Sequence, residues 1–379
     1  MESKKIGKYI ILIAFIVVIC GSRFIWLLVD KYVDDLNNEN RYMAEKPQFS
    51  VNNYTTFASN YESYFEDHLQ FRQLLIELNN VIDYFIFETS SNDSVIIGEE
   101  GWLFYIESLH DYQRINQYSQ EELEAIRGKV MRTKKYFAEQ GIEFVIFIGP
   151  NKNTIYGEYM PSKYYVSDES SRIEQLVEYL KETTDVNIIY PNEELNEAKE
   201  IHPELLYYLK LDTHWNYMGG YFGSIPLLES LKVSPVDFED IEYTIVNEPD
   251  FIWGGYDEAN MLGLARELNE DTNYILHGGA LDYVRYQGDS RRNVDYYNGV
   301  IRTYSDIGDK RKVFLARDSF GEAITPYLGA AFSEVCSVKT ADLYAGQIEM
   351  EKPDILVLEI VERSVTIDSF DYLTWYYER

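Results

Sequence analysis

Three short runs of apolar, β-branched and aromatic residues limit most strongly what this chain can fold into. They are IEFVIFIGP (142–150), VFLA (313–316) and the apolar part of DILVLEIVERSV (354–365). A strand that is apolar on both faces has to be covered on both faces, which is typical of a parallel sheet between two layers of helices. Helix-like segments separate these runs, so strand and helix alternate as in an α/β domain.

The intervening segments carry helix signals. Residues 119–141 start with a serine, have a glutamate three positions later and end with a glycine, which predicts a capped helix. Residues 168–184 and 219–232 are also expected to be helical, and residues 186–190 are typical of a short strand. Residues 235–310 are rich in Gly, Asn, Asp and Tyr, which predicts β-hairpins or an insertion. We therefore expect a three-layer α/β domain with a parallel sheet.

The N-terminal region predicts a membrane anchor. Residues 9–29, YIILIAFIVVICGSRFIWLLV, are long enough to span a bilayer as a helix. Lysines precede this segment and mostly acidic and polar residues follow it, so residues 1–8 are expected in the cytoplasm and the rest of the chain outside. A cleaved signal peptide is the alternative, but no small-x-small cleavage site follows the apolar run. We expect a single pass through the cell membrane.

Between the anchor and the α/β domain lies a segment with helical spacing. Residues 54–87 carry apolar residues three and four positions apart without proline or glycine. A turn cluster and β-type residues follow, in SSNDSVIIGEEGWLFY (90–105). We expect a helical stalk or collar over residues 30–94 and the main domain over residues 95–379.

Charge and composition exclude several kinds of function. The formal net charge of −30 argues against a nucleic-acid partner, because phosphate backbones are bound by lysine and arginine. The two cysteines cannot form a disulfide framework, and no two of the five histidines share a metal-ligand spacing. No glycine-rich phosphate loop is present. We expect no metal and no cofactor.

A serine follows one of the predicted strands directly. In FLARDSFG (314–321) the strand runs into Arg317, Asp318 and Ser319, and a helix is expected to begin there. Such a serine has an exposed hydroxyl, and the unpaired N–H groups of the helix N-terminus can stabilise an oxyanion. The alternative is that Asp318 or Ser319 only caps the helix, which these residue types do often.

The segment LDTHWN (211–216) supplies a base for such a serine. Asp212 and His214 are two positions apart, so on an extended loop their side chains can lie on one side. A histidine can take the serine proton, and a carboxylate can hold the histidine tautomer. The alternative is a structural histidine bonded to the backbone. The Asp212 and His214 pair indicates catalysis only in combination with a serine elsewhere in the chain, such as Ser319.

The ordered set of these motifs resembles a known family, the AlgX/AlgJ-type alginate O-acetyltransferases and the related DHHW proteins, which share an SGNH-hydrolase-like, flavodoxin-like fold. The resemblance covers nearly everything from residue 45 to the end, in family order. It rests on AEKPQFS, YESYFEDHLQFRQLL, VIIGEEGWLFY, IGPNKNTIYGEYMP, LKLDTHWNYMGG, VFLARDSFGEAITPYL and ILVLEIVERS. The chain departs from the family at Thr213, where the DHHW name has a second histidine, and at Arg317, which replaces the glycine of Gly-Asp-Ser.

The resemblance implies a role for each candidate residue. Ser319 would be the acyl nucleophile, His214 the general base and acid, and Asp212 the residue that orients it. The Ser319 N–H would bind the oxyanion together with a second donor. Candidates for that donor or for substrate contacts lie beside strand ends or in the His214 loop: Asn151, Lys152, Arg317, Arg363 and Trp215.

The resemblance also implies partners. A membrane-bound O-acyltransferase would supply the acetyl group, a polysaccharide would accept it, and the N-terminal helix would hold the domain at the membrane. The negative net charge favours a neutral or amino-sugar polymer over alginate. Two alternatives stay open: an esterase or deacetylase with the same triad, and a scaffold of a polysaccharide-export complex without catalysis.

Overall fold

The structure is a computed structural model that describes residues 44–50, 53–68, 72–247, 256–287, 300–371 and 373. The expected cytoplasmic N-terminus (1–8) and membrane anchor (9–29) lie outside these ranges. Within the described part of the chain, no helix has both the length and the apolar character needed to cross a bilayer.

The chain divides into two compact units. The first contains Met1–Ser91 with Asn260–Ala265, and the second contains Asn92–Ala259 with Arg266–Arg379. The second unit begins three residues before the boundary at residue 95 that the sequence indicated. In the first unit, two helices, α2 (Phe57–Asp67) and α3 (Arg72–Phe87), occupy the segment expected to be helical.

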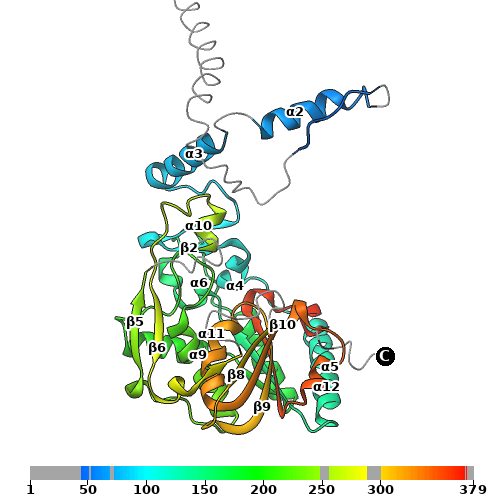
Figure 1. Cartoon of the computed structure of the whole chain (residues 1–379), viewed down its shortest axis with the longest axis vertical. Coiled ribbons are helices and arrows are strands. Elements are labelled where there is room, and N and C mark those ends of the chain that lie inside the picture. The colour runs from blue at the N-terminus through cyan, green and yellow to red at the C-terminus, as the bar shows by residue number, and fades with distance from the viewer. Residues whose placement is uncertain are drawn as a thin grey trace, which may run out of the picture. The chain divides into compact units, whose positions relative to one another are not determined.

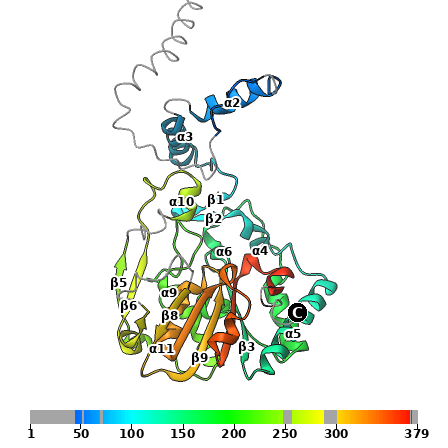
Figure 2. The same cartoon turned by 45° about the vertical axis from the view of Figure 1, so that its right-hand side comes forward.

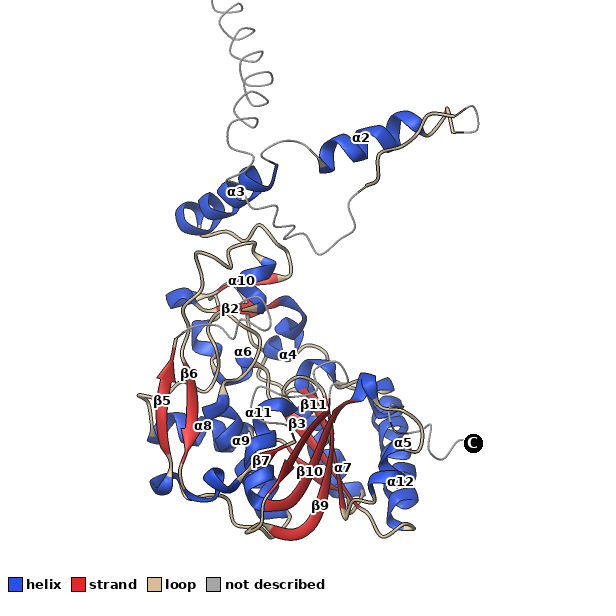
Figure 3. Ribbon diagram, in the orientation of Figure 1, coloured by secondary structure: helices blue, strands red, loops and turns tan. Residues whose placement is uncertain are grey.

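The second unit is built on a seven-stranded sheet, drawn in red in Figure 3. The strand order is β4-β3-β11-β9-β10-β8-β7, with β4 (Asn187–Ile189), β3 (Glu143–Gly149), β11 (Ile355–Val361), β9 (Asp309–Arg317), β10 (Phe332–Lys339), β8 (Val300–Tyr304) and β7 (Arg285–Tyr286). The strands from β4 to β10 are parallel, but β8 pairs antiparallel with both of its neighbours. The sheet is therefore mixed, and the expectation of a wholly parallel sheet is wrong at this edge. The link from β8 to β9 is only Ser305–Gly308. So short a link reverses the direction of the chain, whereas two parallel strands need a much longer crossover between them. For this reason β8 runs opposite to β9 and β10.

Helices cover both faces of the sheet. Along β3, Phe144, Ile146 and Ile148 belong to one buried cluster, while Val145 and Phe147 belong to another. The first cluster is completed by α5 (Gln120–Ala138), α7 (Arg172–Thr183) and α12 (Gln347–Glu351), and the second by α8 (Asn192–Ile201), α9 (Tyr217–Ser230) and α11 (Gly321–Ala331). In Figures 1 and 2, α9 and α11 accordingly lie on the opposite side of the sheet from α5. The expected three layers are present.

Local sequence signals define several element ends as predicted. Ser119 accepts the Glu122 N–H, and Glu122 reaches back to the Ser119 N–H, so a complete capping box starts α5. Gly141 has a φ of +78° where the chain leaves this helix for β3. The capping box at Ser119 and the left-handed glycine at Gly141 explain why α5 falls inside the range expected from the sequence.

The remaining elements are short. A hairpin of β1 (Val95–Ile97) and β2 (Leu103–Tyr105) opens the unit, and an antiparallel pair of β5 (Glu242–Val246) and β6 (Asn273–His277) lies in the region expected to form hairpins. Short helices are α4 (Leu109–Gln113), α6 (Lys152–Ile155) and α10 (Asp257–Met261). The carboxyl ends of β3, β11 and β9 are neighbours at one edge, which is where open α/β sheets carry their sites.

Candidate active site

Ser319 lies in the turn between β9 and α11. The carboxylate of Asp318 fixes this turn, because Oδ1 accepts the Phe320 N–H (2.8 Å) and Oδ2 accepts the Val361 N–H of β11 (2.7 Å). The N-cap position of α11 is Phe320, so neither Asp318 nor Ser319 caps the helix with its side chain. The hydroxyl of Ser319 is thus left available to another partner.

A buried glutamate supports the same turn from below. Glu359 is fully buried in β11, and its Oε2 accepts the N–H groups of Asp318 and Gly321, both at 3.0 Å. A Cβ at Gly321 would come within 2.5 Å of the Arg317 Cβ and 2.8 Å of Glu359 Oε2, so only glycine fits. Burial, and then the Asp318 charge, hold the pKa of Glu359 well above its ordinary value.

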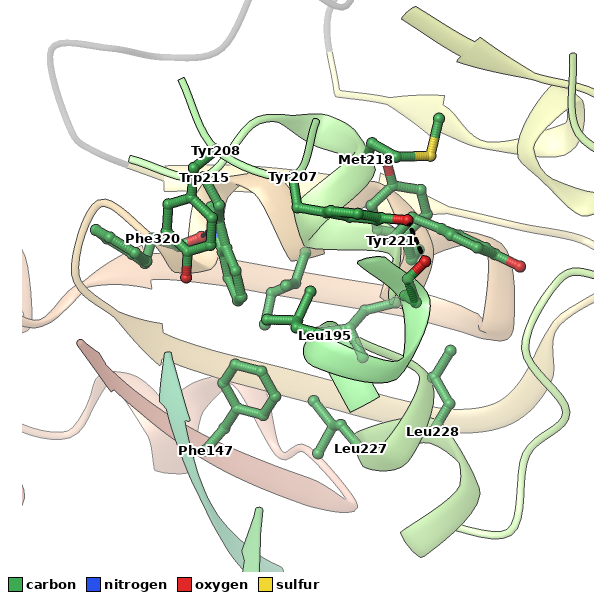
Figure 4. Close-up of a cluster of buried hydrophobic side chains, with 14 of the residues drawn as sticks. Phe147, Leu195, Tyr207, Tyr208, Trp215, Met218, Tyr221, Leu227, Leu228 and Phe320 are labelled. Atoms are coloured by element: carbon green, nitrogen blue, oxygen red, sulfur yellow. Dashed lines mark hydrogen bonds between the residues drawn. The ribbon is translucent and has the colours of Figure 1, made fainter. Parts of the chain in front are cut away.

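The loop that carries His214 is anchored by the residues after it. Trp215 is buried, pairs with Tyr208 as a β-bridge, and donates its Nε1–H to the Phe320 carbonyl (2.9 Å). Figure 4 shows its ring among the buried aromatic side chains, beside Phe320 and Tyr208. Asn216 then caps α9 through the Gly219 N–H. The loop is consequently tied both to the core and to the serine turn.

Ser319, His214 and Asp212 form a continuous hydrogen-bonded chain. His214 Nε2 lies 2.7 Å from Ser319 Oγ, and His214 Nδ1 lies 2.6 Å from Asp212 Oδ1. Since Asp212 can only accept, Nδ1 carries the proton and Nε2 is free to accept the Ser319 proton. Asp212 is itself held by the His214 N–H (3.0 Å) and the Asp257 N–H (2.9 Å). This is the arrangement that activates a serine hydroxyl.

The electrostatics of the pair suit a base. Burial alone would raise the pKa of Asp212, but the His214 charge and the hydrogen bonds outweigh it and lower the pKa to about 2. Burial alone would lower the pKa of His214, but the Asp212 charge and hydrogen bond outweigh it and raise the pKa above its ordinary value. The pair therefore combines an ionised carboxylate with an imidazole that is more basic than an ordinary histidine.

The Ser319 N–H and the Arg363 guanidinium are the candidate donors for an oxyanion. Neither the Ser319 N–H nor the Arg363 guanidinium makes a hydrogen bond or ion pair within the ranges that the structure describes. The Arg363 guanidinium lies 5.1 Å from the centre of the Phe320 ring and 5.8 Å from that of Tyr105. Its charge acts on His214, whose pKa it lowers slightly against the larger effect of Asp212. Their lack of hydrogen-bond partners in the described part of the chain makes them candidates for binding an oxyanion at Ser319.

The structure corrects the expectation for Lys152. Its side chain is 4% exposed, and its ammonium donates to the carbonyl oxygens of Leu209 (3.2 Å), Lys210 (3.2 Å) and Asp212 (2.8 Å). It also pairs with the buried Glu258 of α10 at 2.5 Å. Lys152 is therefore committed to holding the loop of Asp212 and is not free to bind an oxyanion.

Three further candidates are likewise occupied. Arg317 is 1% exposed and donates to Ser337 Oγ (2.7 Å) and to the Asp318 carbonyl. Asn151 is buried, donates to Asp111 (3.2 Å) and accepts the Arg363 N–H (3.2 Å). Trp215 is buried in the core, and its indole N–H is taken by the Phe320 carbonyl. Asn151 thus positions Arg363, and Arg317 supports the serine turn.

Sequence reasoning missed Glu359 and Asp257. The sequence does carry a signal for Glu359. An acidic residue inside the apolar run of β11 is unusual and indicates a buried polar contact. No local signal marks Asp257, which reaches the site only through the fold.

A polar cavity of about 190 Å³, lined in part by Asp111, Asn153 and Glu362, also lies at this edge of the sheet.

The α/β fold and the hydrogen-bonded serine, histidine and aspartate are similar to those of SGNH-hydrolase-like domains. Residues 95–235 match the family described as SGNH hydrolase-like domain, acetyltransferase AlgX. The resemblance to AlgX/AlgJ-type proteins noted in the sequence is confirmed. The matched segment includes Asp212 and His214 and ends before Ser319.

Solved structures support the same fold. PatB1 of Bacillus cereus matches with a TM-score of 0.53 and 16% identity over 74% of this chain and 100% of its own. Its structure with a sulfonyl adduct matches with a TM-score of 0.51 and 15% identity, covering 73% and 99%. A DHHW family protein of Eubacterium siraeum matches with a TM-score of 0.51 and 14% identity, covering 74% and 98%. Comparison with curated proteins finds no match to this chain.

Proposed function

We propose that this chain is an extracytoplasmic O-acetyltransferase that passes an acetyl group through Ser319 to a hydroxyl of a cell-surface or secreted polysaccharide. The observation that carries the proposal is the bridge formed by His214, 2.7 Å from Ser319 Oγ and 2.6 Å from Asp212 Oδ1. The AlgX-type match over residues 95–235 supports acetyl transfer as the reaction class.

The first half of the reaction loads the serine. Ser319 Oγ attacks the carbonyl carbon of an acetyl donor while His214 Nε2 takes its proton. The Ser319 N–H and the Arg363 guanidinium stabilise the oxyanion, and Asp212 stabilises the imidazolium. The carbonyl re-forms as the bond to the leaving group breaks, and His214 returns the proton to that group. The product is an acetyl ester of Ser319.

The second half transfers the acetyl group. An acceptor hydroxyl gives its proton to His214 Nε2 and attacks the acetyl carbon. The second tetrahedral intermediate uses the same donors, and its collapse returns the proton to Ser319 Oγ. With water as acceptor the same steps give an esterase. A non-catalytic scaffold would not need the aligned hydrogen bonds between Asp212, His214 and Ser319.

The cellular arrangement is part of the proposal. Residues 9–29 would anchor the chain, with residues 1–8 in the cytoplasm and the catalytic domain outside. A membrane-bound O-acyltransferase would then deliver acetyl groups to Ser319. The negative net charge favours a neutral or amino-sugar polymer as acceptor.

The test compares the wild type with Ser319→Ala, using Ser333→Ala at the amino end of β10 as the matched control. Each is incubated with an activated acetyl ester, with and without candidate oligosaccharides, and products are followed by mass spectrometry. We expect acetylated sugar from the wild type and the control only. Acetate release without sugar acetylation would replace the transferase by the esterase, and no difference between Ser319→Ala and wild type would refute both.

A covalent probe gives a second readout. The Bacillus cereus PatB1 structure with a sulfonyl adduct suggests a sulfonyl fluoride as the reagent. A reactive serine forms a sulfonate ester with loss of fluoride. We expect the added mass on the peptide containing Ser319 in the wild type and none in Ser319→Ala.

A further inference from the structure

A second carboxylate stands behind the imidazole of His214. Asp257, the first residue of α10, has its Oδ2 at 3.7 Å from His214 Nδ1, the nitrogen that also faces Asp212. One oxygen or nitrogen atom of each of these three side chains lies within 4.8 Å of the others. The imidazole therefore faces two acidic groups on the side opposite to Ser319.

Asp257 is fixed in this place by three hydrogen bonds. Its Oδ1 accepts the Thr213 N–H (2.7 Å) and its Oδ2 accepts the Thr213 hydroxyl (2.6 Å). Its own N–H donates to Asp212 Oδ2 (2.9 Å). Thr213 stands where the DHHW name has a histidine, and its N–H and hydroxyl both donate to Asp257, while its Oγ1 also lies 3.4 Å from His214 Nδ1. The contact joins α10 to all three residues of the loop segment Asp212–His214.

This placement has an electrostatic cost. Burial, followed by the Asp212 charge, raises the pKa of Asp257, while His214 and Thr213 oppose the rise. The charged or titratable groups that face His214 are Asp212, Asp257 and Arg363. Two negative groups near one positive group leave an excess of negative charge beside the imidazole. That excess favours the imidazolium, which is the form that exists after His214 has taken a proton.

We propose that Asp257, held by Thr213, is a second positioning carboxylate of His214, which fixes the loop and stabilises the imidazolium formed when Ser319 is deprotonated. The role rests on the proposed acetyl transfer. Asp257 does not touch the acyl group, and it acts through His214 alone. Asp212 keeps the direct hydrogen bond to Nδ1, so the two carboxylates have separate tasks.

The test uses the full chain with labelled histidines, and His214→Gln identifies the His214 resonance. Asp257→Asn removes the charge, and Asp257→Glu keeps it. The control is Asp185→Asn, a surface substitution just before the amino end of β4 and so at the edge of the sheet opposite to the site. NMR titration gives the pKa of the imidazole without requiring turnover. The pH dependence of the rate of ester cleavage gives the position of the acid limb, which is the pH range in which activity is lost on acidification.

We expect Asp257→Asn to lower the His214 pKa by about one unit and to move the acid limb to lower pH by the same amount. At the optimum we expect kcat to fall several-fold with KM little changed, and Asp257→Glu to restore much of both. Asp185→Asn should match the wild type. If Asp257→Asn does not fold, Asp257→Ser takes its place.

An unchanged His214 pKa and acid limb in the folded charge-removing variant would overturn the proposal and leave Asp257 as a loop contact only. If the wild type itself lacks activity on ester and sugar, the proposed function fails. The NMR shift would then still decide whether Asp257 acts on His214, so the two failures are distinguishable.

Discussion

Whether a serine after a strand is a nucleophile depends on what its neighbours do. In this chain Asp318 satisfies the backbone of the turn, with hydrogen bonds to Phe320 and Val361, and the only side-chain partner of Ser319 in the described part of the chain is His214. The sequence left open whether Asp318 or Ser319 caps the helix. Asp318 makes the hydrogen bonds of the turn and Ser319 bonds to His214, so neither side chain caps the helix. The Ser319 hydroxyl is therefore placed to react.

The basicity of His214 predicts a pH dependence. Because Asp212 raises the imidazole pKa in the folded protein, His214 stays protonated to a higher pH than an ordinary histidine, and only its neutral form can accept the Ser319 proton. We expect the acid limb of kcat/KM for an activated acetyl ester to lie above about 6.5, the ordinary histidine value. In Asp212→Asn the limb should shift to lower pH and the rate should fall. A limb at or below the ordinary value in the wild type would contradict this.

Arg363 gives a second prediction for a single side chain. Its guanidinium makes no hydrogen bond or ion pair among the described residues, although it lies over the Phe320 and Tyr105 rings. Removing one oxyanion donor costs about 10²–10³ in kcat. We expect Arg363→Met to lower kcat by roughly that factor with little change in KM, measured with a small acetyl ester. The control is Arg285→Met, which removes an exposed arginine that pairs with Asp306. An equal loss in both variants would rule out a specific role for Arg363.

The β9–α11 turn shows how one element end is built from distant strands. Glu359 on β11 accepts two N–H groups of this turn, and Gly321 allows the close approach. A buried acid inside an apolar strand is costly unless it is hydrogen-bonded, so its place beneath the serine turn accounts for its presence. The turn is consequently held by β9, α11 and β11 together.

The close approach predicts a stability effect. Gly321→Ala would place a Cβ against Arg317 and Glu359, and overpacking of this kind costs about 1–3 kcal/mol. We expect that loss in denaturant unfolding, together with reduced activity, because Ser319 is two residues away. In Gly128→Ala, in the middle of α5, the new Cβ meets only Arg132 at 3.5 Å. That control should be neutral or stabilising, and equal losses in both would contradict the steric explanation.

The pair of Lys152 and Glu258 predicts coupling between two elements. Lys152→Met would leave the Glu258 carboxyl buried without its partner, and breaking a buried pair in this way costs about 3–5 kcal/mol. We expect a large loss of unfolding free energy and of kcat, since the loop of Asp212 loses its ammonium support. The double variant with Glu258→Gln should recover part of the stability. Additive losses would mean that the two side chains do not act as a pair.

At the scale of the whole molecule, charge sets which acceptors can approach. The net charge of −30 repels polyanions over a distance that salt shortens, about 8 Å at physiological ionic strength. We expect a neutral oligosaccharide to be acetylated with a KM that depends little on salt. A uronate oligomer should show a higher KM that falls as salt is raised. A preference for the uronate at low salt would contradict the choice of a neutral or amino-sugar acceptor.

The site could be predicted only in part, for a physical reason. Asp212 and His214 are two positions apart in the sequence, and Ser319 follows a recognisable strand, so local patterns and the family resemblance identified them. Lys152 was misjudged because a lysine beside a strand end gives no sign of whether its ammonium will meet solvent or carbonyl oxygens. Asp257 was missed because it shares no local pattern with His214.

The sequence by itself determined the alternation of buried strands and capped helices, since apolar runs and capping residues act within a few positions. The tertiary structure decided which strands are neighbours, and so brought the ends of β3, β11 and β9 to one edge. It also decided that β8 runs antiparallel, that Lys152, Asn151 and Arg317 are occupied, and that the Arg363 guanidinium makes no hydrogen bond or ion pair within the described residues. These outcomes depend on contacts between residues up to 212 positions apart, which no local pattern encodes.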